Sequence, residues 1–264
     1  MIISEIGWNF LGNLELAKKM IDASILSHCK FVKFQLWDPK NLKKGPWDND
    51  GRREIYEKAF LDYERYYQLY SYAKSKNISC FASVFDNESF NILKSIDTEY
   101  IKIPSTEAHD IQLIKKSLDN FQNVIVSTGA QKKEEIEILK QFSDIDNFNI
   151  LHCVSSYPLE YDLCNFEKFF YLKSIFKNVG YSGHAKGIYD AIFALSNGAK
   201  IVEKHFTTDN NLEGRDNKFA LLPNELKLIC EFEQIIKKMS LNKGLDLQEC
   251  EVDVFNNYRE RWRK

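Results

Sequence analysis

Two histidines are the residues whose type and spacing most directly indicate chemistry. His184 follows a short apolar segment at residues 179–182, and His205 lies in a second one at residues 200–206. The residues between them have the spacing of a helix from 187 to 197. If the apolar segments are neighbouring parallel strands, the two imidazoles emerge at the same rim. Two neutral imidazoles that converge on one point are a natural pair of ligands for a divalent metal.

Strand and helix patterns alternate along the chain and predict the frame that positions these histidines. Eight segments have strand patterns, at residues 2–7, 31–36, 78–84, 99–103, 123–127, 148–153, 179–182 and 200–206. The predicted helices span residues 14–27, 55–75, 86–96, 111–118, 132–142, 163–176, 187–197 and 222–239. Eight such units favour an α/β fold, a single-domain (β/α)8 TIM barrel. An open sheet would usually have a G-x-G-x-x-G loop after its first strand, and residues 7–12 do not match this motif. We expect the barrel at residues 1–240 and a short C-terminal extension at 241–264.

In such a barrel the C-terminal ends of all strands face one site, and polar side chains gather there. They are Glu5, Lys33, Gln35, Ser83, Lys102, Ser105, Ser127, Ser155, Tyr157, Ser182, His184, His205 and Asp216. Lys33 and Lys102 are the most informative, because an unpaired ammonium inside a barrel is costly, whereas a serine at a strand end is usually a turn residue. Two lysines and several hydroxyls in a ring suit a phosphate or a carboxylate. The pattern therefore predicts an anion site beside a metal site.

The composition argues against several other classes of protein. The chain has 264 residues, 44% of them hydrophobic, and a net charge of −2, so no basic field points to nucleic acid or an anionic membrane. The first residues lack the pattern of a signal peptide, and no apolar run approaches the ~18–20 residues of a membrane span. The six cysteines form no C-x-x-C pair, so we expect free thiols in a cytoplasmic protein.

Several stretches resemble the sialic acid synthases, the family of N-acetylneuraminate synthase and its pseudaminic and legionaminic acid relatives. They are SEIGWNFLGN, VKFQ, IKIPSTE, STG, LHCVSSYP, GYSGHAKG, EKHFT and GRD, in the family's order from residue 4 to about residue 216. The resemblance implies a homodimeric barrel that condenses phosphoenolpyruvate with an aldose, N-acetylmannosamine or a related amino sugar. The products would be a 2-keto-3-deoxy (nonulosonic, sialic-acid-like) sugar acid and phosphate, released by C–O cleavage.

Carried over position by position, the resemblance implies roles for the residues of this rim. His184 and His205 would bind a divalent metal, with Mn²⁺ expected and Mg²⁺ or Co²⁺ as alternatives. The implied catalytic residues are Glu5, Lys33, Gln35, Tyr157 and Asp216. The implied phosphoenolpyruvate-binding residues are Lys33, Ser83, Lys102, Ser105, Ser127, Ser155 and Ser182. The metal would polarise the sugar aldehyde, and the lysines and hydroxyls would hold the phosphate as negative charge moves onto it.

Three departures from the family pattern concern the sugar. Many relatives have aspartate at the position of Gly183, and glycine cannot orient the ligand or contact the sugar as aspartate could. Many also have histidine where this chain has Asn217. In relatives, an antifreeze-like domain usually follows the barrel and gives an arginine to the partner's sugar site. The basic segment 258–264 or a separate antifreeze-like protein could take its place here; the alternative is that this segment is a solvated tail.

Two other functions fit parts of the pattern. A pyruvate-using lyase of the Schiff-base type needs a desolvated lysine and no metal, which fits the two histidines poorly. A non-catalytic or partner-dependent barrel that binds phosphoenolpyruvate or a sugar phosphate would keep the fold without turnover. The presence of Glu5, both lysines and both histidines favours the enzyme. The sequence therefore predicts a phosphoenolpyruvate-dependent transferase that forms C–C bonds and resembles the sialic acid synthases.

Overall fold

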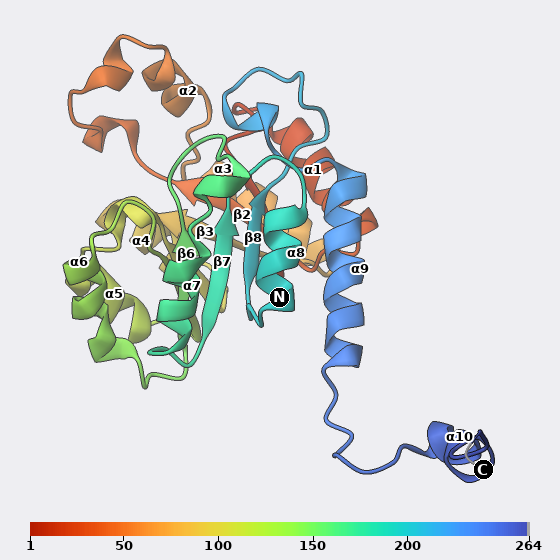
Figure 1. Cartoon of the computed structure of the whole chain (residues 1–264). Helices are drawn as coiled ribbons and strands as arrows, with labels where there is room; N and C mark the ends of the chain where they lie inside the picture. Colours follow the sequence, from red (N-terminus) through yellow and green to blue (C-terminus); the bar gives the residue numbers. More distant parts are fainter. Residues whose placement is uncertain (263–264) are drawn as a thin grey trace.

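The apolar segments of the sequence form eight short strands that close into a barrel. The computed structural model describes residues 1–262 (Figure 1). The strands are β1 (Ile2–Gly7), β2 (Phe31–Leu36), β3 (Ser79–Val84), β4 (Tyr100–Ile103), β5 (Asn123–Ser127), β6 (Phe148–Cys153), β7 (Val179–Gly183) and β8 (Val202–His205). Each strand pairs in parallel with the next, and β8 pairs with β1. The predicted TIM barrel is thereby confirmed.

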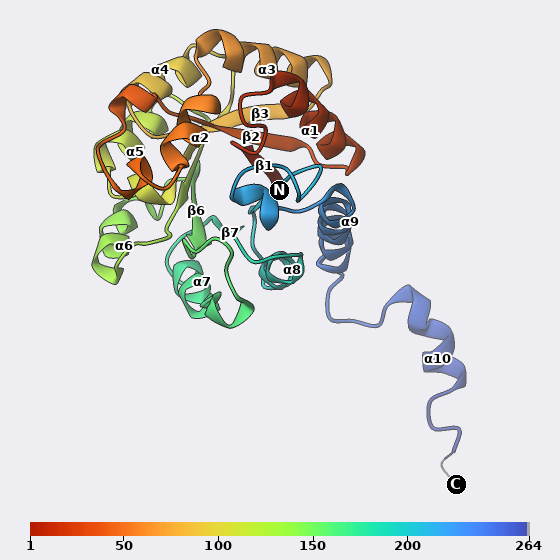
Figure 2. The same ribbon diagram turned by 90° about the horizontal axis from the view of Figure 1, so that it is seen from above.

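Helices surround the barrel (Figure 2). They are α1 (Leu14–Leu26), α2 (Arg52–Lys58), α3 (Tyr63–Ser75), α4 (Asn87–Lys94), α5 (Ile111–Leu118), α6 (Lys133–Leu139), α7 (Phe166–Lys173), α8 (Tyr189–Ser196) and α9 (Pro223–Met239), with α10 (Val252–Asn257) beyond. The single helix predicted at 55–75 is wrong: two helices occupy that region. Asp62 separates them, because its carboxylate accepts a hydrogen bond from the Arg65 backbone N–H at 2.9 Å and caps α3.

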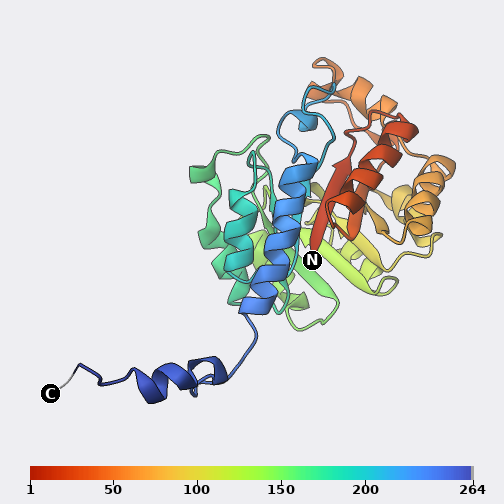
Figure 3. The ribbon, with the colours of Figure 1, turned by 90° about the vertical axis from the view of Figure 1, so that its right-hand side faces the viewer.

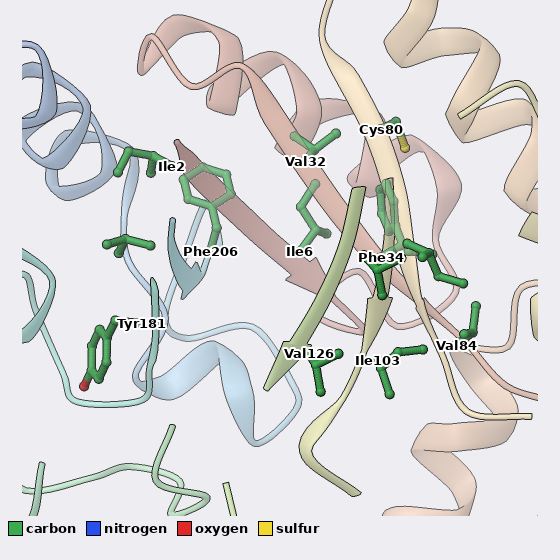
Figure 4. Close-up of a cluster of buried hydrophobic side chains, with 14 of the residues drawn as sticks. Ile2, Ile6, Val32, Phe34, Cys80, Val84, Ile103, Val126, Tyr181 and Phe206 are labelled. Carbon is green, nitrogen blue, oxygen red and sulfur yellow. The ribbon is translucent and has the colours of Figure 1, made fainter. Parts of the chain in front are cut away.

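Alternation along the strands divides the apolar residues into two cores. One fills the N-terminal half of the barrel interior and contains Ile3, Phe81, Ile125, Leu151 and Ile201. The other lies between the strands and the helices, and Figure 4 labels ten of its members: Ile2, Ile6, Val32, Phe34, Cys80, Val84, Ile103, Val126, Tyr181 and Phe206. The inner core closes one end of the barrel, so only the C-terminal end is open to a ligand.

Helix α9 completes the wall beside the N-terminus (Figure 3). The Met1 ammonium lies 2.5 Å from the Glu233 carboxylate of α9. Beyond α9 the chain leads away from the barrel to α10, which is exposed (Figure 1). The last two residues of the basic segment predicted at 258–264 lie outside the described part of the chain.

Two predictions about the type of protein can be compared with the structure. All six cysteines are free, as predicted, and only Cys250 is exposed. Among residues 1–262, no helix combines the length and the apolar character that crossing a membrane requires.

The inner core makes a prediction about stability. Leu151→Ala should lower the free energy of unfolding by about 2–5 kcal/mol, because Leu151 is fully buried among side chains that cannot collapse into the space. Leu245→Ala removes the same atoms from a fully exposed side chain and should change it by less than about 0.5 kcal/mol. Urea unfolding followed by circular dichroism compares them. Equal losses in both variants would contradict the assignment of Leu151 to the core.

Candidate active site

The C-terminal ends of the strands surround a cavity of about 750 Å³. This volume lies in the range typical of small-molecule sites. Every predicted site residue lines it: Glu5, Lys33, Gln35, Ser83, Lys102, Ser105, Ser127, Ser155, Tyr157, Ser182, His184, His205 and Asp216. They come together because alternate residues of a barrel strand face inward and because the loops that follow the strands begin at the same rim. The roles implied for them individually remain predictions.

Buried charges form the floor of the cavity. The Lys33 ammonium, from β2, lies 2.7 Å from the Glu5 carboxylate of β1 and donates a hydrogen bond to the Ser83 hydroxyl at 2.6 Å. The Gln35 amide donates to the same Glu5 side chain at 2.5 Å. Lys33 and Glu5 are both only 1% exposed, so this pair is held in a low-dielectric interior.

Glu203 belongs to this floor and was missed by the sequence analysis. Its carboxylate lies 3.3 Å from the Lys102 ammonium and 3.7 Å from that of Lys33. It also accepts a hydrogen bond from the Ser182 hydroxyl at 3.0 Å. The alternation of β8 contained a usable signal, because Glu203 is two residues before His205 and faces the same side of the strand.

The two carboxylates of the floor have different proton affinities. Burial raises the pKa of Glu5 to about 7, although the nearby Lys33 opposes the shift. Burial alone would also raise the pKa of Glu203, but the ammoniums of Lys102 and Lys33 outweigh it and lower the pKa to about 2. Near neutral pH, Glu203 is therefore ionised while Glu5 can gain or lose a proton. A pKa near 7 is what a general acid or base requires at that pH.

Hydroxyl groups cover one wall near the floor. The Ser105 hydroxyl accepts a hydrogen bond from the Gly129 backbone N–H at 2.9 Å. Gly129 permits the close approach, because a Cβ there would lie 2.2 Å from the Ser155 Oγ and 2.8 Å from the Ser105 Oγ. The Ser127 Oγ is buried and has no hydrogen-bond partner within residues 1–262. Unused hydroxyl donors beside two ammoniums can bind an anion.

The two predicted metal ligands also lie together at the cavity. The rings of His184 and His205 have centroids 5.5 Å apart. His184 Nδ1 is 2.8 Å from the Val154 carbonyl, which accepts its proton and leaves Nε2 with a free lone pair in the neutral ring. Burial lowers the pKa of His205 well below its usual value, so this ring is neutral. His205 Nδ1 has no hydrogen-bond partner in the described residues and lies 3.6 Å from the Asp216 carboxylate.

Within residues 1–262, no group of three or more His, Cys, Asp and Glu side chains is arranged to hold a metal ion. The protein therefore offers two imidazoles, with the Asp216 carboxylate close to one of them. A metal bound here would complete its coordination with oxygen atoms from other sources, as catalytic sites with an open position do.

Aromatic side chains form the mouth of the cavity, and the sequence analysis did not identify them. The Trp8 ring has its centroid 5.0 Å from that of Tyr56, and Trp37 lies 5.7 Å from Tyr56. Trp8 also donates a hydrogen bond to the Asp216 carboxylate at 2.5 Å. Trp37 begins a long loop, and several of this loop's residues line the cavity. Such a mouth can stack against the apolar face of a ligand.

Two of the departures from the family pattern, Gly183 and Asn217, lie within the barrel but do not line the cavity. Gly183 does not line it, and a Cβ on this residue would meet Asp190 Oδ2 at 2.4 Å, on the helix side of β7. A side chain at residue 183 would therefore point away from the cavity, so this position offers no direct contact with a molecule bound there. Asn217 is fully buried and donates hydrogen bonds to the carbonyls of Asn9 and Glu213 at 3.1 and 2.7 Å, so it supports a loop instead.

Comparisons with known proteins agree with this geometry. The model of the NeuB family matches residues 20–244. The N,N'-diacetyllegionaminic acid synthase of Campylobacter jejuni is 36% identical over 90% of this chain and 77% of its own length. A pseudaminic acid synthase of the same species is 33% identical over 94% of this chain and 77% of its own. The structure of N-acetylneuraminic acid synthetase from Leptospira borgpetersenii, determined with citrate, superimposes with a TM-score of 0.87 at 33% identity, over 100% of this chain and 92% of that one. The chain described here is therefore a member of the NeuB family.

Proposed function

We propose that this protein condenses phosphoenolpyruvate with an amino-sugar aldose, N-acetylmannosamine or a related sugar, to give a nonulosonic acid and phosphate. The observation that carries the proposal is the buried floor, where Lys33 and Lys102 face a cavity with hydroxyl groups beside them. The named relatives are synthases of N-acetylneuraminic, legionaminic and pseudaminic acids, which supports the same class of product.

The proposed reaction balances with one water molecule. The C3 carbon of phosphoenolpyruvate forms a bond to the aldehyde carbon of the open-chain sugar, and water adds to C2. The C2–O bond to phosphate then breaks, and inorganic phosphate leaves with the electron pair. Lys33 and Lys102, whose side chains are almost completely buried, supply fixed positive charge where the phosphate accumulates negative charge.

Glu5 is the proposed general base for the water that adds to C2. Its carboxylate is buried and held by Lys33 and Gln35, so its orientation is restricted. Because burial raises its pKa to about 7, the ionised form is present near neutral pH and still has a useful affinity for a proton. Glu203 stays ionised and balances the charge of the lysines.

His184 and His205 are proposed to hold a divalent metal, Mn²⁺ in the first place and Mg²⁺ or Co²⁺ as alternatives. Both residues fit this role, because His205 has an unpartnered buried nitrogen and the proton of His184 is held by the Val154 carbonyl. The metal would act as a Lewis acid toward the sugar carbonyl. The aromatic mouth would receive the sugar, and a homodimer remains part of the proposal.

The direct test is release of inorganic phosphate from phosphoenolpyruvate with Mn²⁺, using a panel of N-acetylated hexosamines. We expect release that depends on the sugar and is abolished by a chelator. Binding of phosphoenolpyruvate that raises the melting temperature, without turnover of any sugar, would instead favour the non-catalytic barrel. Absence of both turnover and stabilisation would refute the assignment of phosphoenolpyruvate.

Lys102→Gln should lower kcat/KM for phosphoenolpyruvate about 10²–10³-fold, because it removes one of the two buried ammoniums that face the phosphate. Initial rates of phosphate release at varied phosphoenolpyruvate concentration measure the loss. Lys115→Gln removes the same charge from an exposed position on α5 and should leave the rate unchanged. A Lys102→Gln enzyme with wild-type kcat/KM would exclude this lysine from the anion site.

Glu5→Gln should lower kcat about 10²-fold or more, because glutamine cannot accept the proton from water. Glu134→Gln, on an exposed face of α6, is the matched control and should retain full activity. The variant should also lose the part of the pH profile that rises toward pH 7 with ionisation of Glu5. Persistence of that rise in the variant would assign it to another group.

The raised pKa of Glu5 also predicts a pH-dependent stability that needs no catalysis. Between the usual 4.5 and about 7 the folded state binds more protons at Glu5 than the unfolded state, so wild-type stability falls as the pH rises through this window. Glu5→Gln lacks this term. Its unfolding free energy relative to wild type should therefore increase by up to about 3 kcal/mol from pH 4.5 to pH 7 and then level off. A constant difference across this range would contradict the raised pKa.

A further inference from the structure

The outer side of β7 and β8 carries a charged pair that does not face the cavity. Gly183 of β7 and Lys204 of β8 are register partners, and neither lines the cavity, whereas their neighbours His184 and His205 do. Asp190, in the first turn of α8, extends its carboxylate into the space beside them. The Asp190 and Lys204 side chains are both almost completely buried.

The Lys204 ammonium makes three hydrogen bonds, which is its full capacity. It donates to the two carboxylate oxygens of Asp190 at 2.9 and 2.8 Å and to the Ala185 carbonyl at 2.6 Å. Asp190 also accepts from the Tyr181 hydroxyl at 3.1 Å and from the Ala191 backbone N–H at 2.8 Å. Every polar atom of this pair is therefore satisfied.

Gly183 leaves the space that this pair occupies. A Cβ at this position would lie 2.4 Å from Asp190 Oδ2, 2.5 Å from the Tyr181 ring and 3.0 Å from the Lys204 side chain. Glycine is thus required as long as Asp190 extends to Lys204. Gly183 and Asp190 are complementary, since one provides the space and the other fills it with a carboxylate.

The pair is connected to the proposed metal site through the main chain. The Ala185 carbonyl, which accepts from Lys204, belongs to the residue directly after His184. On the other side, the His184 carbonyl accepts from the Leu159 N–H at 3.1 Å, and His184 Nδ1 is held by the Val154 carbonyl at 2.8 Å. Lys204 therefore holds the residue after His184 from the helix side, and the segment after β6 holds His184 itself from the other side.

We propose that Asp190 and Lys204 are positioning residues that hold the His184 backbone in the geometry needed to bind a divalent metal. Stability alone does not explain a buried ion pair, because well-packed apolar residues of similar size are often as stabilising or more so. A fixed orientation of a metal ligand is a function that apolar residues cannot supply, and loss of such support typically weakens metal binding 10–100-fold. The inference rests on the proposed function only in naming the metal.

The test replaces the pair by apolar residues, in the double variant Asp190→Leu with Lys204→Met. Two readouts apply to the full chain: calorimetric titration with Mn²⁺ alone, and the nitrogen-15 NMR signals of the His184 ring in the metal-free protein. We expect the Kd for Mn²⁺ to rise at least about tenfold. We also expect the signals that report the Nδ1 proton of His184 to shift, while the melting temperature stays within a few degrees of wild type. The control is Asp146→Leu with Lys177→Met. It removes an exposed ion pair in which the Lys177 ammonium lies 3.2 Å from the Asp146 carboxylate, in the loops that precede β7 and β6, and it should change neither readout.

Wild-type Mn²⁺ affinity and an unchanged His184 signal in the folded double variant would overturn the inference. If the wild-type protein bound no Mn²⁺, the metal part of the proposed function would fail, and the NMR signal would still decide whether the pair positions His184. If the apolar variant did not fold, Asp190→Asn with Lys204→Gln takes its place. A glutamine amide has two N–H donors where the ammonium has three, so at least one of the three hydrogen bonds of Lys204 is lost together with both charges, and the same two changes are expected.

Discussion

The burial of two lysine ammoniums inside a barrel is the constraint on which the rest of this site depends. An isolated ammonium would be too costly in this environment, so the barrel must supply negative charge at close range. Glu5 does so for Lys33, and Glu203 does so for Lys102. An anionic ligand that binds the lysines must therefore compete with these carboxylates. Near neutral pH Glu203 stays ionised, whereas burial raises the pKa of Glu5 to about 7, so the two carboxylates do not compete equally with such an anion.

The two faces of β7 and β8 differ in what their polar side chains contact: those of the inner face line the cavity, and those of the outer face pair with α8. On the inner face, Glu203 and His205 line the cavity, while between them Lys204 faces outward to α8. The inner face must remain available to ligands, so its polar groups are incompletely paired, as the unpartnered nitrogen of His205 illustrates. The outer face has no such requirement, and the hydrogen-bonding capacity of Lys204 is fully used there. A preorganised site needs hydrogen-bonding groups on the inner face that are free to bind a ligand, and fully paired groups on the outer face that hold the strands in place.

The sequence alone was sufficient to predict the barrel and the inward-facing polar residues. The strand period of two can be seen locally in the sequence, and the meeting of all strand ends at one rim follows from the topology of the barrel. Glu203 was missed although the same period places it on the face of His205, because a carboxylate next to a lysine in a strand also has the pattern of a surface pair. The Asp190–Lys204 pair was equally hidden, because Asp190 comes from a helix and meets Lys204 only in the packed structure. The same pair explains why residue 183 is glycine, because a Cβ there would lie 2.4 Å from Asp190 Oδ2.

The residues that line the cavity differ in chemical type between its floor and its mouth. This difference affects where each of two different substrates could bind. Its floor is ionic and buried, and its mouth is lined by Trp8, Trp37 and Tyr56. A small, highly charged molecule gains most at the floor, whereas a sugar with an apolar face gains most from the aromatic rings. Asp216 links the two levels, because it accepts a hydrogen bond from Trp8 and lies 3.6 Å from His205. In the proposed reaction, phosphoenolpyruvate would then occupy the floor and the sugar would occupy the mouth.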